Sequence, residues 1–339
     1  MLQLCVSPPP PPTVLGLTPT LPRPLRNWKW LTVPVPAERA AALRIAVAAL
    51  FLSDILIFYL PAWKYVYGPG GFGDPSVYDS VFAWPSLKWS LLRLLPPTWG
   101  PPLLLGVWMV ACVVLLLGYR PRLTAFVCWV VAVSFFQSNP HTHNGGDQLK
   151  LPLLFMLCFL PSDGCWAIRR HPLARAATGP VLVQPWPIRL LMLQIAVVYF
   201  MNGYYKAMGP QWRDGTIMTD VANNPTWAHF SPNYLHLPDV ALQALSYGTL
   251  VWELLFPLLV LMPVTRNATL WIGVFFHVGT LIHLEVSWFP LYSLCYYVPF
   301  VPWERWRSKT PLAGSPSATP LNEKKDLLFT TNGSVQNVH

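Results

Sequence analysis

The chain has 339 residues, of which 53% are hydrophobic and only 11% are charged. Soluble domains carry roughly a quarter charged residues, so this composition excludes an ordinary soluble enzyme and indicates a membrane protein. The net charge of +9 does not require a nucleic-acid partner, because cytoplasmic loops of membrane proteins are rich in Lys and Arg. No nucleic-acid-binding motif occurs, and we expect no nucleic acid to bind.

The two ends of the chain differ from its middle. Residues 1–35 contain the run Pro8–Pro12 and further prolines, which predicts a disordered or polyproline arm. The arm lacks the continuous apolar segment of a cleavable signal peptide, so the first spanning helix is expected to direct insertion. Residues 308–339 are rich in Ser, Thr, Asn and Lys and are predicted to be a disordered tail. The folded transmembrane domain is therefore expected over residues 36–307.

Apolar segments of about 17–23 residues, the length that a bilayer core requires, recur through this domain. They predict an all-α fold, a polytopic membrane helix bundle of about eight transmembrane helices. Pro152 and Pro161 interrupt the fourth segment, and the last one is short, so either could be tilted or re-entrant. The predicted spans are 41–61, 102–119, 122–138, 148–166, 186–207, 240–262, 267–284 and 287–302.

Basic residues predict the orientation of these helices, because Lys and Arg concentrate in cytoplasmic loops. With an even number of spans and a cytoplasmic N-terminus, most of the 23 Lys and Arg residues fall on the inner side. Both termini are then cytoplasmic. The basic residues left at the outer side are Lys64, Lys88, Arg93, Lys150, Lys206 and Arg213.

Three polar segments meet on the outer face in this topology. They are residues 138–148, which include Asp147, then Lys206 with residues 212–215, and finally residues 283–287. The two longest loops, 62–101 and 208–239, lie on the same side. A functional site is therefore expected to open outward.

Lys206 stands where an apolar helix changes into a polar loop, in the run YFMNGYYKAMGPQWRDG from Tyr199 to Gly215. Ionisable groups at the edge of a hydrocarbon core are often functional, although lysines at helix ends also extend to the headgroups without doing chemistry. If Lys206 is buried, loss of hydration favours the neutral amine, which can accept a proton from a phenol or hydroquinone. Tyr199 and Asn202 share its helical face, as ligands or as interhelical hydrogen-bonding groups.

Three other predicted spans contain an ionisable residue: Asp54, Glu253 and His277. Such groups face one another or a wet cavity rather than lipid, so Asp54 and Glu253 are candidate counter-ions for Lys206, or carboxyl groups that are held neutral. His277 is interpreted first as a hydrogen-bonding tie between helices. His141 and His143 form only a weak metal pattern and none of the six cysteines forms a CxxC pair, so no metal site is predicted.

Several runs together resemble the HTTM (horizontally transferred transmembrane) domain family. They are NPHTHNGGDQLKLPLLFMLCFLPSDGCW, the Lys206 segment, WELLFPLLVLMPVTR and GVFFHVGTLIHLEVSWFPLYSL, in matching order from about residue 38 to 306. The resemblance extends to the membrane domain of vitamin K-dependent gamma-glutamyl carboxylase. It implies a polytopic membrane fold with its site built on these segments.

By this resemblance, Lys206 would be the base that deprotonates vitamin K hydroquinone or another quinol. Oxidation of the quinol would then supply the strong base that removes a proton from a glutamate of an exported polypeptide before carboxylation. His277 matches a Phe-His step of that enzyme and is the second candidate catalytic residue. The candidate quinone- or substrate-binding residues are Tyr199, Asn202, Trp212, Asp147 and Glu253.

The chain also departs from that enzyme. It has Asn144-Gly145-Gly146 where the carboxylase has Asn-Asn-His, and residues 308–339 stand where the carboxylase carries a large lumenal domain. These differences leave two functions open. One is a quinol-dependent, carboxylase-like enzyme, and the alternative is a non-enzymatic membrane protein that binds lipid or assists the maturation of a partner.

Overall fold

The structure is a computed structural model that describes residues 10–18, 28–81, 89–138, 145–230 and 237–305. The chain divides into two units, residues 1–304 and 305–339, and the helices and strands named below all belong to the first. The predicted tail and the histidines at positions 141 and 143 lie outside the described residues.

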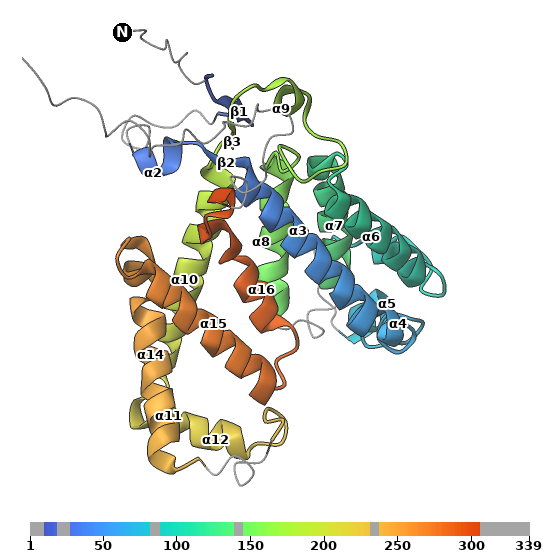
Figure 1. Cartoon of the computed structure of the whole chain (residues 1–339). Helices are drawn as coiled ribbons and strands as arrows, with labels where there is room; N and C mark the ends of the chain where they lie inside the picture. Colours follow the sequence, from blue (N-terminus) through green and yellow to red (C-terminus); the bar gives the residue numbers. More distant parts are fainter. Residues whose placement is uncertain (1–9, 19–27, 82–88, 139–144, 231–236, 306–339) are drawn as a thin grey trace, which may run out of the picture. The chain divides into compact units, whose positions relative to one another are not determined.

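Helices make up most of the first unit (Figure 1). The helices are α2 (Lys29–Thr32), α3 (Ala37–Asp54), α4 (Leu60–Val66), α5 (Pro75–Val81), α6 (Gly100–Leu117), α7 (Pro121–Phe136), α8 (Gly145–Phe159), α9 (Pro172–Ala176), α10 (Trp186–Met208), α11 (Pro210–Asp214), α12 (Ile217–Asn223), α14 (Asp239–Leu261), α15 (Arg266–His283) and α16 (Phe289–Cys295). A π-helix, η1 (Ile55–Tyr59), joins α3 to α4, and short 3₁₀ turns are η2 (Leu91–Arg93) and η4 (Val298–Phe300).

Each predicted span overlaps a helix, although the last one holds only the short α16 and η4, and only part of the predicted count is confirmed. Within the described residues, three helices are long and apolar enough to cross a membrane: the continuous 30-residue helix Ala37–Val66, the 18-residue helix Gly100–Leu117 and the 23-residue helix Asp239–Leu261. Pro121–Phe136 is apolar but shorter. Of the remaining spans, α8 and α16 are shorter than 18 residues, whereas α10 and α15 are long enough but less apolar.

The fold also contains a small three-stranded sheet, and the all-α prediction did not include this sheet. The strands are β1 (Thr13–Leu15), β2 (Val35–Pro36) and β3 (Val181–Val183), in the order β1-β3-β2. β1 pairs in parallel with β3 and β2 pairs antiparallel to it. Part of the arm expected to be disordered is therefore ordered here, and Leu15 is only 1% exposed.

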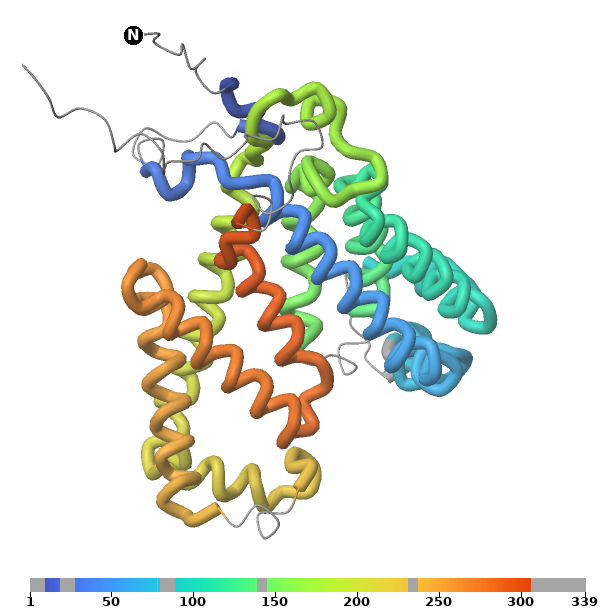
Figure 2. Tube along the Cα trace, in the orientation of Figure 1, coloured from blue at the N-terminus to red at the C-terminus, as the bar shows by residue number. Residues whose placement is uncertain are grey.

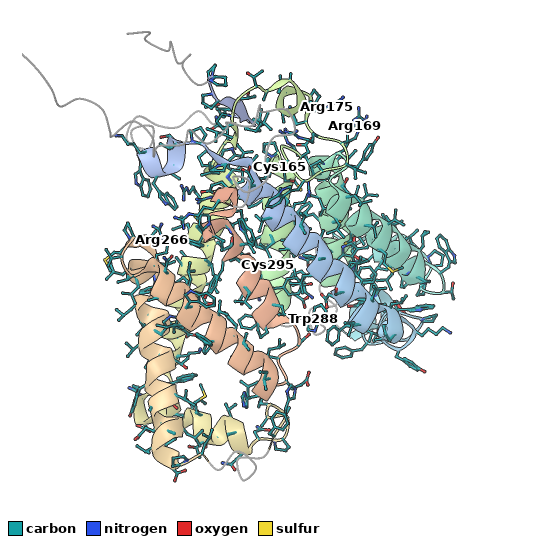
Figure 3. All side chains as sticks on the ribbon, in the orientation of Figure 1. Cys165, Arg169, Arg175, Arg266, Trp288 and Cys295 are labelled. Atoms are coloured by element: carbon teal, nitrogen blue, oxygen red, sulfur yellow. The ribbon has the colours of Figure 1, made fainter. Side chains whose placement is uncertain are left out.

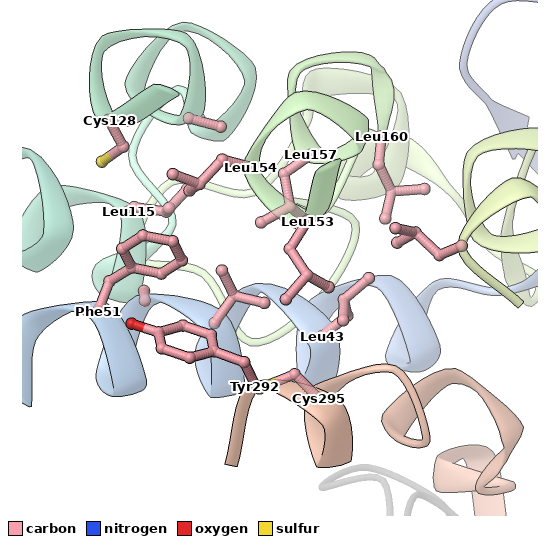
Figure 4. Packing of buried hydrophobic residues seen from close by; sticks show 14 of the residues in the cluster. Leu43, Phe51, Leu115, Cys128, Leu153, Leu154, Leu157, Leu160, Tyr292 and Cys295 are labelled. Atoms are coloured by element: carbon pink, nitrogen blue, oxygen red, sulfur yellow. The ribbon is translucent and has the colours of Figure 1, made fainter. Parts of the chain in front are cut away.

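The core of the first unit lies where α3 packs against α6, α8 and α16 (Figure 4). Phe51 of α3 is fully buried and its ring contacts those of Trp108 and Tyr292, at centroid distances of 5.8 Å and 5.3 Å. Alanines at positions 40, 41 and 48 of α3 are also fully buried. These small side chains let neighbouring helices approach closely, as is usual between membrane helices.

The segments predicted to be cytoplasmic gather at one end of the helices. Arg39 forms an ion pair with Glu304 at 2.8 Å, and the guanidinium of Arg189 lies 5.1 Å from the ring of Trp30. Figure 3 labels three more basic residues at this end: Arg169 in the loop after α8, Arg175 in α9 and Arg266 at the start of α15. This grouping is the one that the charge pattern predicts, and the orientation in the membrane stays a prediction.

Arg44 connects α3 to the loop after α8 at this end. Its guanidinium is fully buried and donates hydrogen bonds to the carbonyl oxygens of Ser162, at 2.6 Å, and Trp166. Gly118, which ends α6 with φ +77°, packs directly against it. Glycine is required at position 118 for two reasons. L side chains rarely adopt this backbone conformation, and an added Cβ would lie 2.4 Å from an Arg44 nitrogen.

We therefore predict that Gly118→Ala lowers the free energy of unfolding by more than about 1–2 kcal/mol, the usual cost of the left-handed conformation alone. Gly106→Ala in the same helix is the matched control, since an added Cβ there meets nothing within 4 Å. Alanine is the better helix former, so this variant should be as stable as the parent or slightly more so. Thermal unfolding in detergent measures both, and equal melting temperatures for the two variants would contradict the prediction.

Candidate functional site

The Lys206 segment ends α10 beside the middle of α14. Gly203, one turn before Lys206, allows this contact, because an added Cβ would meet Leu254 N at 2.9 Å and Glu253 Cβ at 3.1 Å. Gly209 and Pro210 follow Lys206 and end the helix. The sequence therefore sets both the close approach of the two helices and the position of the amine at the end of one of them.

Lys206 and Glu253 form an ion pair, with 2.5 Å between Nζ and Oε1. The carboxyl side chain is 3% exposed and the lysine side chain 26% exposed. Nζ also lies 4.8 Å from the centroid of the Trp212 ring, on α11. The candidate counter-ion Glu253 is thus the actual partner of Lys206, and the lysine side chain is partly exposed rather than fully buried.

His277, on α15, contacts Tyr199 of α10, and the Tyr199 hydroxyl lies 2.7 Å from that of Tyr297. All three side chains are buried. The Tyr199 ring packs on Trp252 and Phe256 of α14, at centroid distances of 4.7 Å and 4.1 Å. His277 therefore connects α15 to α10, as the sequence interpretation favoured. The Tyr199 ring that it contacts packs on α14 within one turn of Glu253.

Asp54, a candidate counter-ion of Lys206, and Asp147, a candidate substrate-binding residue, belong instead to a cluster around Lys150. Nζ of Lys150 lies 2.7 Å from Asp54 Oδ2 and 2.8 Å from Asp147 Oδ1. The Tyr292 hydroxyl donates to Asp54 Oδ2 at 2.6 Å. Each member is at most 7% exposed. We call these four residues the Lys150 cluster.

The Lys150 cluster joins α3, α8 and α16. The ammonium also lies 4.9 Å from the ring centroid of Tyr292 and 5.4 Å from that of Tyr59. Tyr59 is on η1, the π-helix that follows Asp54 directly. Single π-helical turns insert one residue into a helix and rotate the residues after it, which here accompanies the approach of Tyr59 to the ammonium.

An apolar pocket of about 320 Å³ lies between α12, α14 and α15. In Figure 2, α12 runs across the open ends of α14 and α15, away from the turn that joins them. Thr249, one turn before Glu253, and Thr280, one turn after His277, both line it. We call this cavity the α14–α15 pocket.

A loop segment closes one side of the α14–α15 pocket. Ala228 pairs with Leu284 as an isolated antiparallel bridge. His229 binds the carbonyl oxygen of Ile282 through Nδ1 at 3.0 Å and the carboxylate of Glu285 through Nε2 at 2.8 Å. The hydrogen bond to Ile282, followed by that to Glu285, raises the pKa of His229 above its usual 6.5.

The remaining candidates are less well placed. Asn202 is half-buried and makes no hydrogen bond to Tyr199 or Lys206 within the described residues. No three His, Cys, Asp or Glu side chains in the described part of the chain are arranged to hold a metal ion. Sequence reasoning missed Lys150, Tyr292, Tyr297 and His229, and only Lys150, a lysine inside a predicted span, carried a signal that would have found it.

Comparison with known proteins identifies the family. The HTTM domain matches residues 34–306, which cover the ion pair, the Lys150 cluster and the α14–α15 pocket. The chain belongs to the HTTM domain family. Because this family is a membrane family and the chain has long apolar helices, the protein is an integral membrane protein that resides in a lipid bilayer.

One curated relative of this HTTM domain protein is YitO of Bacillus subtilis (strain 168), which is described as uncharacterized. The two are 28% identical over 116 residues, 34% of this chain and 37% of the bacterial protein. The match thus covers well under half of YitO. No solved structure matches the chain.

We predict that Lys150→Met strongly destabilises the HTTM domain, because it leaves two buried carboxylates without their cation. Removing one partner from a buried ion pair costs about 3–5 kcal/mol. The matched control is Lys64→Met, since Lys64 is exposed and lies over the Trp63 ring at 5.8 Å without a carboxylate partner in the described structure. Thermal melts in detergent should show a large loss for the first variant only, and similar melting temperatures would contradict the cluster's role.

The loop contact at His229 should weaken as pH rises. A raised pKa in the folded state means that its contribution is fully present below about pH 6.5, the unfolded value, and is lost as pH rises through the higher folded value. Hydrogen exchange should show less protection of the Glu285 and His229 amides, which bind the Trp227 and His283 carbonyls, at pH 8 than at pH 6. Rates are corrected for intrinsic exchange, and His229→Gln should abolish the difference. An equal pH dependence in both proteins would exclude His229 as the cause.

Proposed function

We propose that the protein is a quinol-dependent, carboxylase-like membrane enzyme in which the Lys206–Glu253 pair accepts a proton from a hydroxyl group. The observation that carries this proposal is the pairing of a partly exposed amine with a buried carboxylate at the end of α10. Lys206 is the member that solvent or substrate reaches, and Glu253 is enclosed behind it.

The pair can act as one base. Lys206 first passes a proton to Glu253 Oε1, 2.5 Å away, and the neutral amine that this leaves accepts the proton of a bound hydroxyl. The pair then holds one more proton, and Lys206 is still an ammonium. That charge stabilises the oxygen that has lost its proton, which is the usual contribution of a fixed cation in a site of low polarity.

The residues present fit a small aromatic quinol such as vitamin K hydroquinone. The α14–α15 pocket, at about 320 Å³, is at the lower end of the size range of small-molecule sites and is lined by apolar side chains such as Leu242, Phe275 and Phe276. Buried polar atoms without a hydrogen-bond partner in the described structure, Glu253 Oε2 and His277 Nδ1, lie on the two helices that form it. A quinol would supply an acidic hydroxyl and the electrons that reduce oxygen.

The remaining residues have positioning roles in this proposal. Trp212 covers the ammonium, and Tyr199 holds His277 against α10. Asn202, half-buried on the same helix, is left as a candidate contact of the substrate. Asp147 acts in the Lys150 cluster, so we no longer propose it as a ligand. An exported polypeptide remains the proposed acceptor of carboxylation.

A second function, a non-enzymatic lipid-binding or scaffold protein, is favoured by one observation. The Lys206–Glu253 contact ties α10 to α14 in the same way as His277 ties α15 to Tyr199. A stripe of interhelical polar contacts stabilises a membrane bundle without any chemistry. The two functions are separated by whether the amine is needed for turnover.

The test is oxygen uptake by the purified protein with vitamin K hydroquinone. We expect Lys206→Ala to lower the rate by about 100-fold or more, the usual contribution of a general base. Glu253→Gln should lower it as well, because the amide cannot store the proton.

Lys64→Ala is the matched control, since Lys64 is also a predicted outer lysine beside a tryptophan, Trp63, and should keep the parental rate. All variants are compared at equal folded fraction, judged by their thermal melts. Uptake that is absent from the folded parent, or that survives Lys206→Ala, would reject the enzyme and favour the scaffold function.

A further inference from the structure

A second, larger apolar hollow lies on the other side of the fold, along the α6–α7 hairpin. It has a volume of about 710 Å³ and is lined by side chains of both helices. Gly106 in its floor has no side chain, and an added Cβ would meet nothing within 4 Å. We call this hollow the α6–α7 groove. It is separate from the Lys206 site, so a ligand bound in it is independent of the proposed function.

The α6–α7 groove ends in a basic aromatic group. Tyr119 and Arg120 line that end. Two guanidinium groups lie near the Tyr119 ring, at centroid distances of 5.9 Å for Arg120 and 5.6 Å for Arg169. Arg169 also approaches the Tyr119 hydroxyl at 3.5 Å. Arg169 comes from the loop after α8, so a distant segment completes the group (Figure 3).

The backbone holds this basic group in place. Thr124 donates a hydrogen bond to the carbonyl oxygens of Tyr119, at 2.8 Å, and Arg120, at 3.1 Å. Ile168, next to Arg169, donates its amide to the Leu117 carbonyl at 2.9 Å. Backbone hydrogen bonds next to Arg120 and Arg169 therefore fix both residues at the end of the hairpin, and their guanidinium groups are not needed for this attachment.

No carboxylate in the described part of the chain pairs with either guanidinium. None of the ion pairs among the described residues includes Arg120 or Arg169, and both side chains are exposed. By contrast, Arg39, at the same end of the helices, is matched by Glu304. An unmatched pair of cations at the mouth of an apolar groove is complementary to an anionic headgroup joined to a hydrocarbon chain.

We propose that the α6–α7 groove binds one anionic glycerophospholipid, with its phosphate between Arg120 and Arg169 and one acyl chain along α6 toward Gly106. Guanidinium groups bind phosphate in two-pronged geometry, and basic pockets between membrane helices are known to select anionic headgroups. From Leu117, where α6 ends, back to Gly106 the helix rises about 16 Å, roughly half the thickness of a bilayer's hydrocarbon core. One leaflet's acyl chain therefore spans this part of the groove.

The experiment is native mass spectrometry of the full-length protein in detergent, titrated with palmitoyl-oleoyl phosphatidylglycerol or with the phosphatidylcholine of the same chains. We expect the parent to bind one phosphatidylglycerol at least tenfold more tightly than phosphatidylcholine. Arg120→Gln with Arg169→Gln should remove about tenfold or more of that preference. Arg175→Gln is the charge control, because Arg175 is an exposed arginine of α9, in the same connection between α8 and α10, and does not line the groove.

A second variant tests the acyl chain. Val110→Trp fills the α6–α7 groove with a bulky ring at a position that is already 64% exposed, and it should weaken binding of both lipids. Val113→Trp is its matched control, 41% exposed on the same helix and not part of the groove. Equal affinity of the parent for the two lipids would show an ordinary lipid-facing surface and overturn the proposal. So would unchanged selectivity in the double arginine variant, or equal effects of the two tryptophans.

Discussion

The fold depends on one ammonium group, that of Lys150, being held between two carboxylates inside the helix assembly. Its partners Asp54 and Asp147 come from α3 and α8, and Tyr292 adds α16 through its bond to Asp54. A charge in this surrounding is tolerated only when it is paired. The three helices therefore have a fixed relative register, since sliding any of them by one turn would leave at least one buried charge without its partner.

A second ionic contact, between Lys206 and Glu253, differs from the first in one respect. Lys150 is enclosed, whereas the Lys206 side chain is 26% exposed beside a fully enclosed carboxylate. An enclosed cation serves stability, while a cation open on one side can exchange protons and meet a ligand. The apolar α14–α15 pocket is one turn away on the same helix. This asymmetry distinguishes a chemical role from a structural one within a single fold.

Much of the helical fold could be predicted from sequence, because apolar segments of membrane length leave few alternatives. Pairing was harder. Glu253 was a candidate partner for Lys206 and is its partner, but Asp54 binds Lys150 instead. Residues 54 and 150 are far apart in sequence, and only packing brings them together. β1 could not be recognised because the prolines around it are typical of a disordered arm. The His229–Glu285 contact joins two loops, and loops lack the regular spacing of apolar residues from which helices and strands are predicted.

The parallel pairing of β1 with β3 has a consequence for biosynthesis. Thr13–Leu15 aligns with Val181–Val183, so the first strand leaves the ribosome long before its partner exists. At ordinary rates of translation, of about 5–20 residues per second, the delay is roughly 10–30 s. During that time α3 to α8 are made while the N-terminal strand has no sheet to join. The sheet can therefore form only after the first half of the chain has been synthesised. Because the two strands are paired in the finished fold, both segments must have stayed on the same side of the membrane until then.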